Sequence, residues 1–176
     1  KAVTADPGSE AAACLVDSAL RLSSQHARLA VDLAVPLLSD LDRSQIEHLA
    51  DYTAQRQADL VERYLDPDAG RRKKARSKRF NERIEKWIGR MTSDQRLLVD
   101  ESLERIPDIT PYWLAYREQQ TAGLLDMLEA GADAETLRQY LDSWWVEWGG
   151  RSLDYRRSWH VARLEFVVFL DGLGAS

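Results

Sequence analysis

Four arginines recur along one predicted helix at spacings of four, three and four residues, and they are the clearest chemical signal in the sequence. They are Arg72, Arg76, Arg79 and Arg83. This spacing places the four guanidinium groups on one face of a helix. There they could bind the phosphate groups of phospholipid, lipid A or nucleic acid. The alternative is a solvated face whose charges pair with acidic helices elsewhere in the chain.

The charge distribution favours this alternative. Residues 71–96 carry 11 basic and 3 acidic side chains, whereas residues 1–70 and 97–176 have net charges of −6 and −7. Nucleic acid is the least favoured of the anionic ligands. The whole chain has a net charge of −5 at pH 7, whereas nucleic-acid-binding proteins are more often basic.

Another arginine lies on an apolar helical face. Arg117 follows Trp113 by one turn and shares its stripe with Thr121, Leu124 and Leu128. A guanidinium on such a face needs a partner. Either it stacks on Trp113 and pairs with a carboxylate inside the bundle, or it marks a ligand pocket. Of the two, we expect the structural pair, although the sequence does not identify the carboxylate.

The sequence contains no recognisable catalytic or metal-binding motif. Its histidines, His26, His48 and His160, have no second histidine three or four residues away. Glycine-rich phosphate loops and nucleophile elbows are also missing. The single cysteine, Cys14, excludes an intramolecular disulfide, and we expect a buried free thiol. We therefore expect no enzymatic activity, no metal and no cofactor.

Aromatic residues are concentrated towards the C-terminus. Those on the last two predicted helices are Tyr140, Trp144, Trp145, Trp148, Tyr155 and Trp159. Such a surface could bind peptides, partner proteins or the membrane interface. Because an aromatic stripe on a helix usually faces the interior, we expect core packing between these two helices.

The elements that carry all these residues are predicted to be helices. Hydrophobic residues make up 44% of the chain and charged residues 30%, with only nine glycines and five prolines, as is typical of a globular helical protein. In the first predicted helix, which extends to about Leu38, mostly apolar residues recur at spacings of three and four. This stripe, which we expect to be buried, consists of Leu15, Ala19, Leu22, His26, Leu29, Leu33 and Leu37. Pro36 is expected to kink or end the helix.

Polar residues mark the helix boundaries. Asp42 and Gln45 have the spacing of a capping box, in which each side chain bonds to the backbone of the other residue. Thr92 and Gln95 repeat this spacing fifty residues later. Gly89 is expected to end the basic helix that precedes them.

The remaining boundaries complete a set of seven helices. Helix starts are predicted at Asp66–Pro67, Thr110–Pro111 and Asp133, and helix ends near Ile106, Gly131, Gly149–Gly150 and Leu170. The basic helix is expected to bury an apolar stripe of Phe80, Ile84, Trp87, Ile88 and Met91. Short connections favour an antiparallel bundle around a shared core, so we expect one all-α domain over residues 1–176.

The segment after the arginine-rich helix carries a family resemblance. It reads Glu85-Lys86-Trp87-Ile88-Gly89-Arg90-Met91-Thr92-Ser93-Asp94-Gln95. With Trp113 and Arg117 downstream, it resembles a family of uncharacterised bacterial helical lipoproteins. That family has a Glu-x-Trp-x-Gly-x-Leu-(Ser/Thr)-x-x-Gln stretch followed by Trp-x-x-x-Arg, so the only departure is Met91 in place of Leu. The resemblance covers roughly residues 37–170. The paired capping boxes are also similar to those of the Spy and CpxP periplasmic stress proteins, of which Spy is a chaperone.

The resemblance implies a cellular location and a binding function. It implies that the chain is the C-terminal part of a longer precursor, tethered in the bacterial periplasm by a lipidated cysteine outside this sequence. We therefore expect a non-enzymatic module that binds protein clients or envelope components. Its chaperone-like version has a concave amphipathic surface with the basic helix on the rim. The alternative is an anion-binding module that uses the basic helix, residues 71–83.

Overall fold

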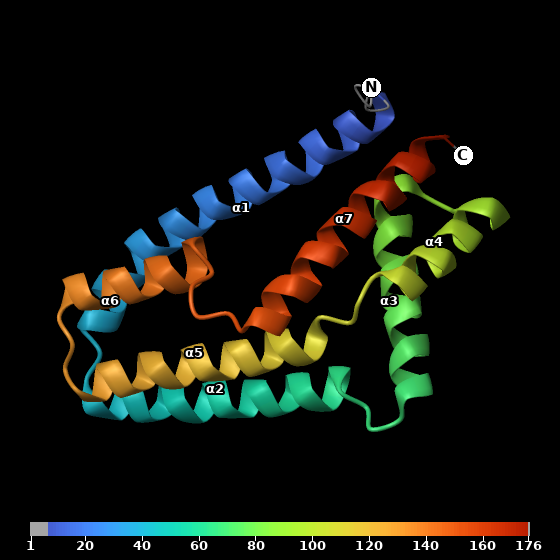
Figure 1. Ribbon diagram of the computed structural model, residues 1–176. Coiled ribbons are helices and arrows are strands. Elements are labelled where there is room, and N and C mark those ends of the chain that lie inside the picture. Colours follow the sequence, from blue (N-terminus) through green and yellow to red (C-terminus); the bar gives the residue numbers. More distant parts are fainter. Residues whose placement is uncertain (1–6, 176) are drawn as a thin grey trace.

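The computed structural model describes residues 7–175, and every regular element in this range is helical (Figure 1). The α-helices are α1 (Pro7–Ser39), α2 (Arg43–Tyr64), α3 (Ala69–Ile88), α4 (Ser93–Arg105), α5 (Thr110–Glu129), α6 (Ala134–Leu141) and α7 (Leu153–Ala175). One π-helical turn, η1 (Asp142–Val146), continues α6. The predicted all-α fold of seven helices is confirmed. Residues 1–6 and 176 of the predicted domain lie outside the described range.

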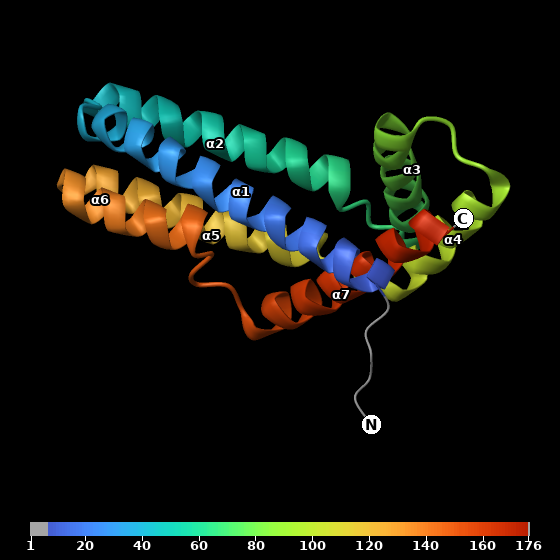
Figure 2. The ribbon, with the colours of Figure 1, turned by 90° about the horizontal axis from the view of Figure 1, so that it is seen from above.

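The buried apolar side chains form two clusters instead of the shared core that we expected. The first lies among α1, α2, α5 and α6, the four-helix lobe, and consists of Val31, Val35, Ile46, Leu124, Leu128, Leu137 and Leu141. The second lies among α3, α4 and α7, the three-helix lobe, and consists of Ile84, Met91, Val99 and Phe169. In the four-helix lobe α2 and α5 lie side by side (Figure 1). From above, α3, α4 and the end of α7 gather at one end of the molecule (Figure 2). Contacts between α1 and α7 join the lobes.

Local hydrogen bonds confirm both predicted capping boxes. The Gln45 N–H donates to Asp42 Oδ1 and the Asp42 N–H donates to Gln45 Oε1, each at 2.9 Å. Thr92 and Gln95 make the same reciprocal pair at 3.1 and 3.2 Å. Gly89 ends α3, as predicted, with a φ of +82° that favours glycine.

Two predicted helix starts are wrong in detail. The cap of α3 is Asp68, whose Oδ1 accepts the Arg71 N–H at 2.7 Å. Asp66 instead accepts a hydrogen bond from the Arg71 side chain at 2.9 Å, and this bond lowers the pKa of Asp66. Thr110 does not cap α5, because it already lies inside the helix, and the preceding Ile109 has no side-chain acceptor.

Pro36 does not end α1, which continues to Ser39. Its missing N–H removes one hydrogen bond, to the carbonyl of Asp32, and the three residues after it remain helical. The helix predicted to reach residue 149 is α-helical only to Leu141. In the π turn that follows, the Glu147 N–H bonds to the carbonyl of Asp142, five residues back, at 3.0 Å.

Candidate functional site

The basic stripe of α3 is largely engaged within the chain. Arg72 Nη1 donates to the backbone carbonyl of Asp66 at 2.6 Å. Arg76 Nη2 donates to the carbonyls of Ile106 and Pro107 at 2.7 and 3.2 Å. Burial lowers the pKa of the Arg76 guanidinium. Backbone carbonyls, more than acidic side chains, are therefore the partners of these two arginines.

The remaining two arginines of the stripe, Arg79 and Arg83, have different surroundings. The guanidinium of Arg79 lies 4.8 Å from the ring centre of Tyr64 at the end of α2, a cation–π arrangement. Arg83 is exposed. Three of the four arginines thus attach α3 to the α2–α3 loop, to the α4–α5 loop and to the end of α2. An anion-binding role for the stripe stays a prediction.

The segment that carries the family resemblance builds the α3–α4 hairpin. Arg96 Nη2 donates to Glu85 Oε1 at 2.8 Å across the hairpin, and Met91 is buried in the three-helix lobe. Trp87 and Ile88 are 84% and 45% exposed and do not join the expected apolar stripe. That part of the prediction is wrong because α3 and α4 splay apart towards the hairpin (Figure 1), which leaves the last turn of α3 without a partner on this side.

Cys14 is exposed, not buried as we expected, because it lies on a solvent-facing side of α1. Within residues 7–175, no group of three His, Cys, Asp or Glu side chains is placed to hold a metal ion.

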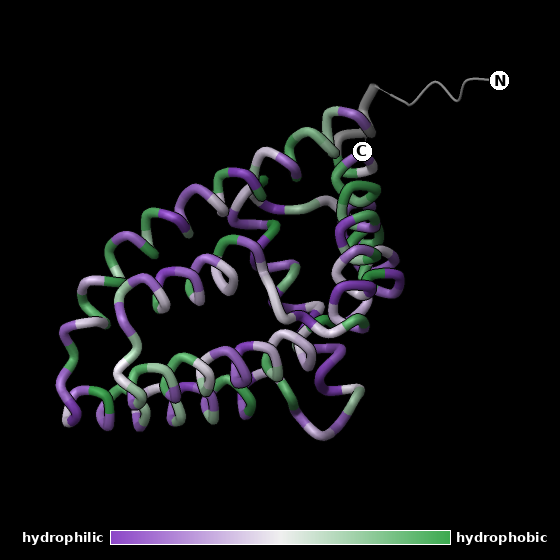
Figure 3. Tube along the Cα trace, turned by 60° about the vertical axis from the view of Figure 1, so that its left-hand side comes forward, coloured by the Kyte–Doolittle hydropathy of each residue, from purple (hydrophilic) through white to green (hydrophobic). Residues whose placement is uncertain are grey.

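The leucine stripe of α1 faces solvent. We call the exposed set the leucine face: Leu15, Leu22, Leu29, Leu33 and Leu37. These side chains are between 53% and 71% exposed, and Figure 3 shows hydrophobic residues along the full length of α1. The prediction that this stripe is buried is wrong, because the opposite face of α1, with Val31 and Val35, packs against α6 and η1.

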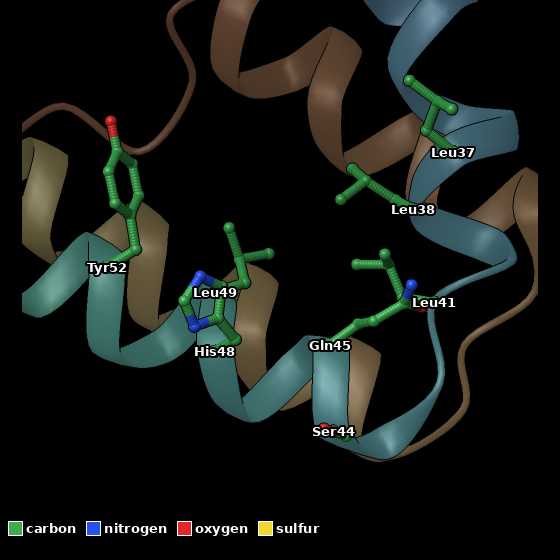
Figure 4. Close-up of a pocket in the computed structure, with 8 residues that line it drawn as sticks. All are labelled: Leu37, Leu38, Leu41, Ser44, Gln45, His48, Leu49 and Tyr52. Atoms are coloured by element: carbon green, nitrogen blue, oxygen red, sulfur yellow. The ribbon is translucent and has the colours of Figure 1, made fainter.

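An apolar groove lies on the four-helix lobe and consists of three adjoining cavities of about 640, 290 and 430 Å³. In the first, between α1 and α2, leucines of both helices point towards the same space (Figure 4). The second lies among α1, α2, α5 and η1, and the third between α2 and α5. The cavities are linked by shared lining residues: Leu37, Leu38 and Leu49, then Thr53, Thr121 and Leu125. We call the three together the central groove.

Arg117 is the only charged side chain that lines the second cavity. Its Nε is buried and has no hydrogen-bond partner, and it forms no ion pair within residues 7–175. Trp113 instead makes an edge-to-face contact with Tyr64, with ring centres 6.2 Å apart. Among the described residues, the ion pair that we expected for Arg117 is absent, and the position of this arginine matches the other interpretation, a ligand pocket.

The π turn aims two tryptophans at the same cavity. Trp144 and Trp145 are adjacent in sequence, and both line the second cavity next to the core of the four-helix lobe. Tyr140 also packs against that core, and Tyr155 is buried. Trp148 is displaced from the expected line, because its φ is +57° and it stacks on Trp159 instead.

Gln57 is a polar residue of the groove that sequence analysis missed. It lines the third cavity, and its Nε2 donates to the carbonyl of Leu114 at 3.1 Å. Its Oε1 is buried without a hydrogen-bond partner in the described residues. No local pattern distinguishes this glutamine from the others, so only the packing of α2 on α5 could identify it.

Comparison with known proteins gives a family but no function. A model of a family of unknown function, DUF6279, matches residues 11–149, a range that includes the resemblance motif and both capping boxes. No curated protein and no solved structure matches the chain. No helix in the described part of the chain is long and apolar enough to cross a membrane. Because the match covers most of the 176 residues, the chain belongs to the DUF6279 family of unknown function.

Proposed function

We propose that this chain is a non-enzymatic binding module of the bacterial envelope that holds apolar segments of other proteins on its leucine face. The observation that carries the proposal is the exposure of five leucines along one 33-residue helix. At 1.5 Å per residue, such a helix is about 50 Å long. A row of exposed leucines of this extent is uncommon on a protein that works alone and usually marks an interaction site.

The spacing of the leucine face suits a helical or extended apolar client. Leu15, Leu22 and Leu29 are separated by seven residues each, and Leu33 and Leu37 follow at intervals of four. Partner side chains can therefore pack between successive turns. Burying one leucine side chain contributes about 1.5–3 kcal/mol. Contacts with several leucines can thus exceed the cost of association and give micromolar affinity.

Two partly exposed ion pairs join α1 to α7 and α6 in the orientation that turns the leucines outward. Asp17 pairs with Arg163 of α7, and Asp32 Oδ1 lies 2.6 Å from Arg138 Nη1 of α6. Arg21 and Arg28 are exposed beside the stripe and supply the charged rim that is typical of protein-binding surfaces.

The envelope location rests on the resemblance to bacterial lipoproteins, which also implies a lipid anchor outside this sequence. The chaperone-like arrangement that we now propose differs from the one expected from sequence. The apolar surface is the outer side of a single long helix, and the basic helix α3 contributes no residue to the central groove.

The anion-binding alternative has less support from the geometry. A phosphate group at the basic stripe would compete with the carbonyls that already accept from Arg72 and Arg76 and with the ring of Tyr64 under Arg79. Of the four arginines of the stripe, Arg83 is the one that is exposed for such a ligand.

The test is suppression of the aggregation of an unfolded client protein, followed by light scattering. We expect the wild-type chain to slow aggregation at equimolar ratio and the triple variant Leu22→Ser, Leu29→Ser, Leu33→Ser to lose most of this effect. The matched control is Leu97→Ser, Leu153→Ser, Leu164→Ser, which removes equally exposed leucines from other helices. It should behave like the wild type.

Three results would overturn the proposal. One is a wild-type chain that does not slow aggregation, and another is a control variant that loses as much activity as the leucine-face variant. The third is a stable dimer in sedimentation experiments that the leucine-face variant dissociates, because the leucines would then serve self-association.

A further inference from the structure

We infer that the central groove binds an amphiphile with an acyl chain and a carboxylate head group, and that Arg117 holds the carboxylate. The inference does not depend on the proposed function, because it rests on Arg117 and on a surface that shares only Leu37 with the leucine face. Its starting point is Arg117, whose buried Nε has no hydrogen-bond partner among the described residues and whose side chain lines an apolar cavity.

A cation in this position calls for an anion. Burial removes the water that would accept a hydrogen bond from the guanidinium. A buried N–H group without another acceptor is therefore unfavourable in a folded protein. The other polar side-chain groups of the second cavity are the hydroxyls of Thr53 and Thr121 and the indole N–H groups of Trp144 and Trp145, none of which is an anion. A carboxylate can accept two parallel hydrogen bonds from one guanidinium, so a ligand head group at this point would satisfy Arg117.

The remaining walls suit an aliphatic chain. Leu38, Leu49 and Leu125 line the second cavity together with Trp144 and Trp145. The two tryptophans are sequence neighbours in the π turn, and both line this cavity. π turns occur frequently at functional sites.

The groove extends from this cavity in both directions. Leu37 and Leu49 continue into the first cavity, and Thr121 and Leu125 continue into the third. An acyl chain that starts at Arg117 can therefore follow the apolar walls over more than one helical turn.

The walls fit an acyl chain better than a peptide. Every lining residue except Leu41 belongs to a helix or to the π turn, so most of the backbone groups along the groove are already hydrogen-bonded within their own elements. A peptide would bury amide groups that find few partners there. An acyl chain has no polar atoms apart from its head group, and the one unpartnered acceptor, Gln57 Oε1, lies in the neighbouring cavity.

Calorimetric titration with three twelve-carbon probes tests the inference on the wild-type chain alone. Dodecanoate should bind at least about tenfold more tightly than neutral dodecanol, and cationic dodecylamine should bind most weakly. An apolar pentapeptide with a free C-terminus forms the fourth arm, titrated into the variant Leu22→Ser, Leu29→Ser, Leu33→Ser so that the leucine face does not contribute, and it should bind more weakly than dodecanoate. Equal binding of dodecanoate and dodecanol, no binding of dodecanoate, or tighter binding of the peptide would overturn the inference.

Substitutions identify the residue responsible. Arg117→Met should weaken dodecanoate binding about tenfold and leave dodecanol binding unchanged, while Arg117→Lys should keep part of the preference for the anion. The matched control is Arg83→Met, which removes an exposed arginine outside the groove and should bind both probes like the wild type. An Arg117→Met variant that still prefers dodecanoate would contradict the assignment.

The result also separates the two proposals. The variant Leu22→Ser, Leu29→Ser, Leu33→Ser changes no residue of the groove and should bind dodecanoate normally even if it no longer protects clients.

Discussion

The two faces of α1 both carry apolar side chains, but one face is buried and the other is exposed to solvent. Val31 and Val35 are 0% and 4% exposed in the core of the four-helix lobe, whereas Leu29 and Leu33, on the other side of the same turns, are more than 60% exposed. Shorter side chains allow α6 and η1 to approach α1 closely, and the leucines are left on the outside. An apolar stripe with helical spacing therefore predicts that a helix has an apolar face. It does not predict whether other helices of the same protein bury that face.

Stability measurements should separate the two faces most strongly. Val31→Ala with Val35→Ala leaves cavities in the core and is expected to lower the free energy of unfolding by about 3 kcal/mol. Leu29→Ala and Leu33→Ala should each change it by less than about 0.5 kcal/mol, because solvent already reaches these side chains. Urea unfolding followed by circular dichroism measures both, and equal losses from the two pairs would mean that the leucine face is buried.

The turn between α1 and α2 brings Ile46 into one cluster with Val31 and Val35, which we call the valine face of α1. The capping box of this turn can be removed by a single substitution. Asp42→Ala deletes the acceptor for the Gln45 N–H and should lower the free energy of unfolding by about 1 kcal/mol. Thr92→Ala, in the three-helix lobe, provides the matched comparison and should have an effect of similar size. No loss from either change in urea unfolding would show that these caps contribute nothing to stability.

Acid should weaken the helix that covers the valine face. The predicted cap of α6, Asp133, accepts the Thr136 N–H at 2.8 Å, and this hydrogen bond lowers its pKa below the ordinary value of 3.8. The stabilisation is therefore present above the unfolded-state pKa and is lost as the pH falls through the folded-state pKa. The stability difference between the wild type and Asp133→Ala should shrink below about pH 4; a difference that grows there would reverse the sign.

The smallest effect is expected from the ion pair between Asp17 and Arg163, whose side chains are both partly exposed. Asp17→Asn should cost less than about 0.5 kcal/mol, because solvent screens such pairs. The loss should vanish at about 1 M salt. A larger loss that persists in salt would mean that this contact, more than valine packing, fixes the orientation of α1.

Features that depend on neighbouring residues could be predicted from the sequence. The capping boxes at Asp42 and Thr92 and the glycine end of α3 follow from interactions within one helical turn. Helix number and class follow from the apolar periodicity. The same reasoning could not decide which side of α1 faces the core, because that depends on α6 and η1, about a hundred residues away in sequence.

The candidate groove shows the same limit. Its arginine could be identified as unusual, since Arg117 lies on an apolar stripe, but the absence of a carboxylate partner is a property of the packed helices. The convergence of Trp144 and Trp145 depends on a π turn that periodicity does not reveal. The partners of the basic stripe could not be predicted either. Arg72 and Arg76 donate to backbone carbonyls, and because every residue has a carbonyl, the sequence does not indicate which ones accept.

Thiol labelling at single positions tests most directly whether the leucine face is free to bind a client. In a Cys14→Ser background, Leu29→Cys should react with a soluble thiol reagent at the rate of an exposed thiol, whereas Val31→Cys should be protected. Addition of an unfolded client should slow the reaction at Leu29→Cys at least about tenfold and leave an exposed control, Leu97→Cys, unchanged. Slow labelling of Leu29→Cys without client, or an unchanged rate with it, would contradict the account.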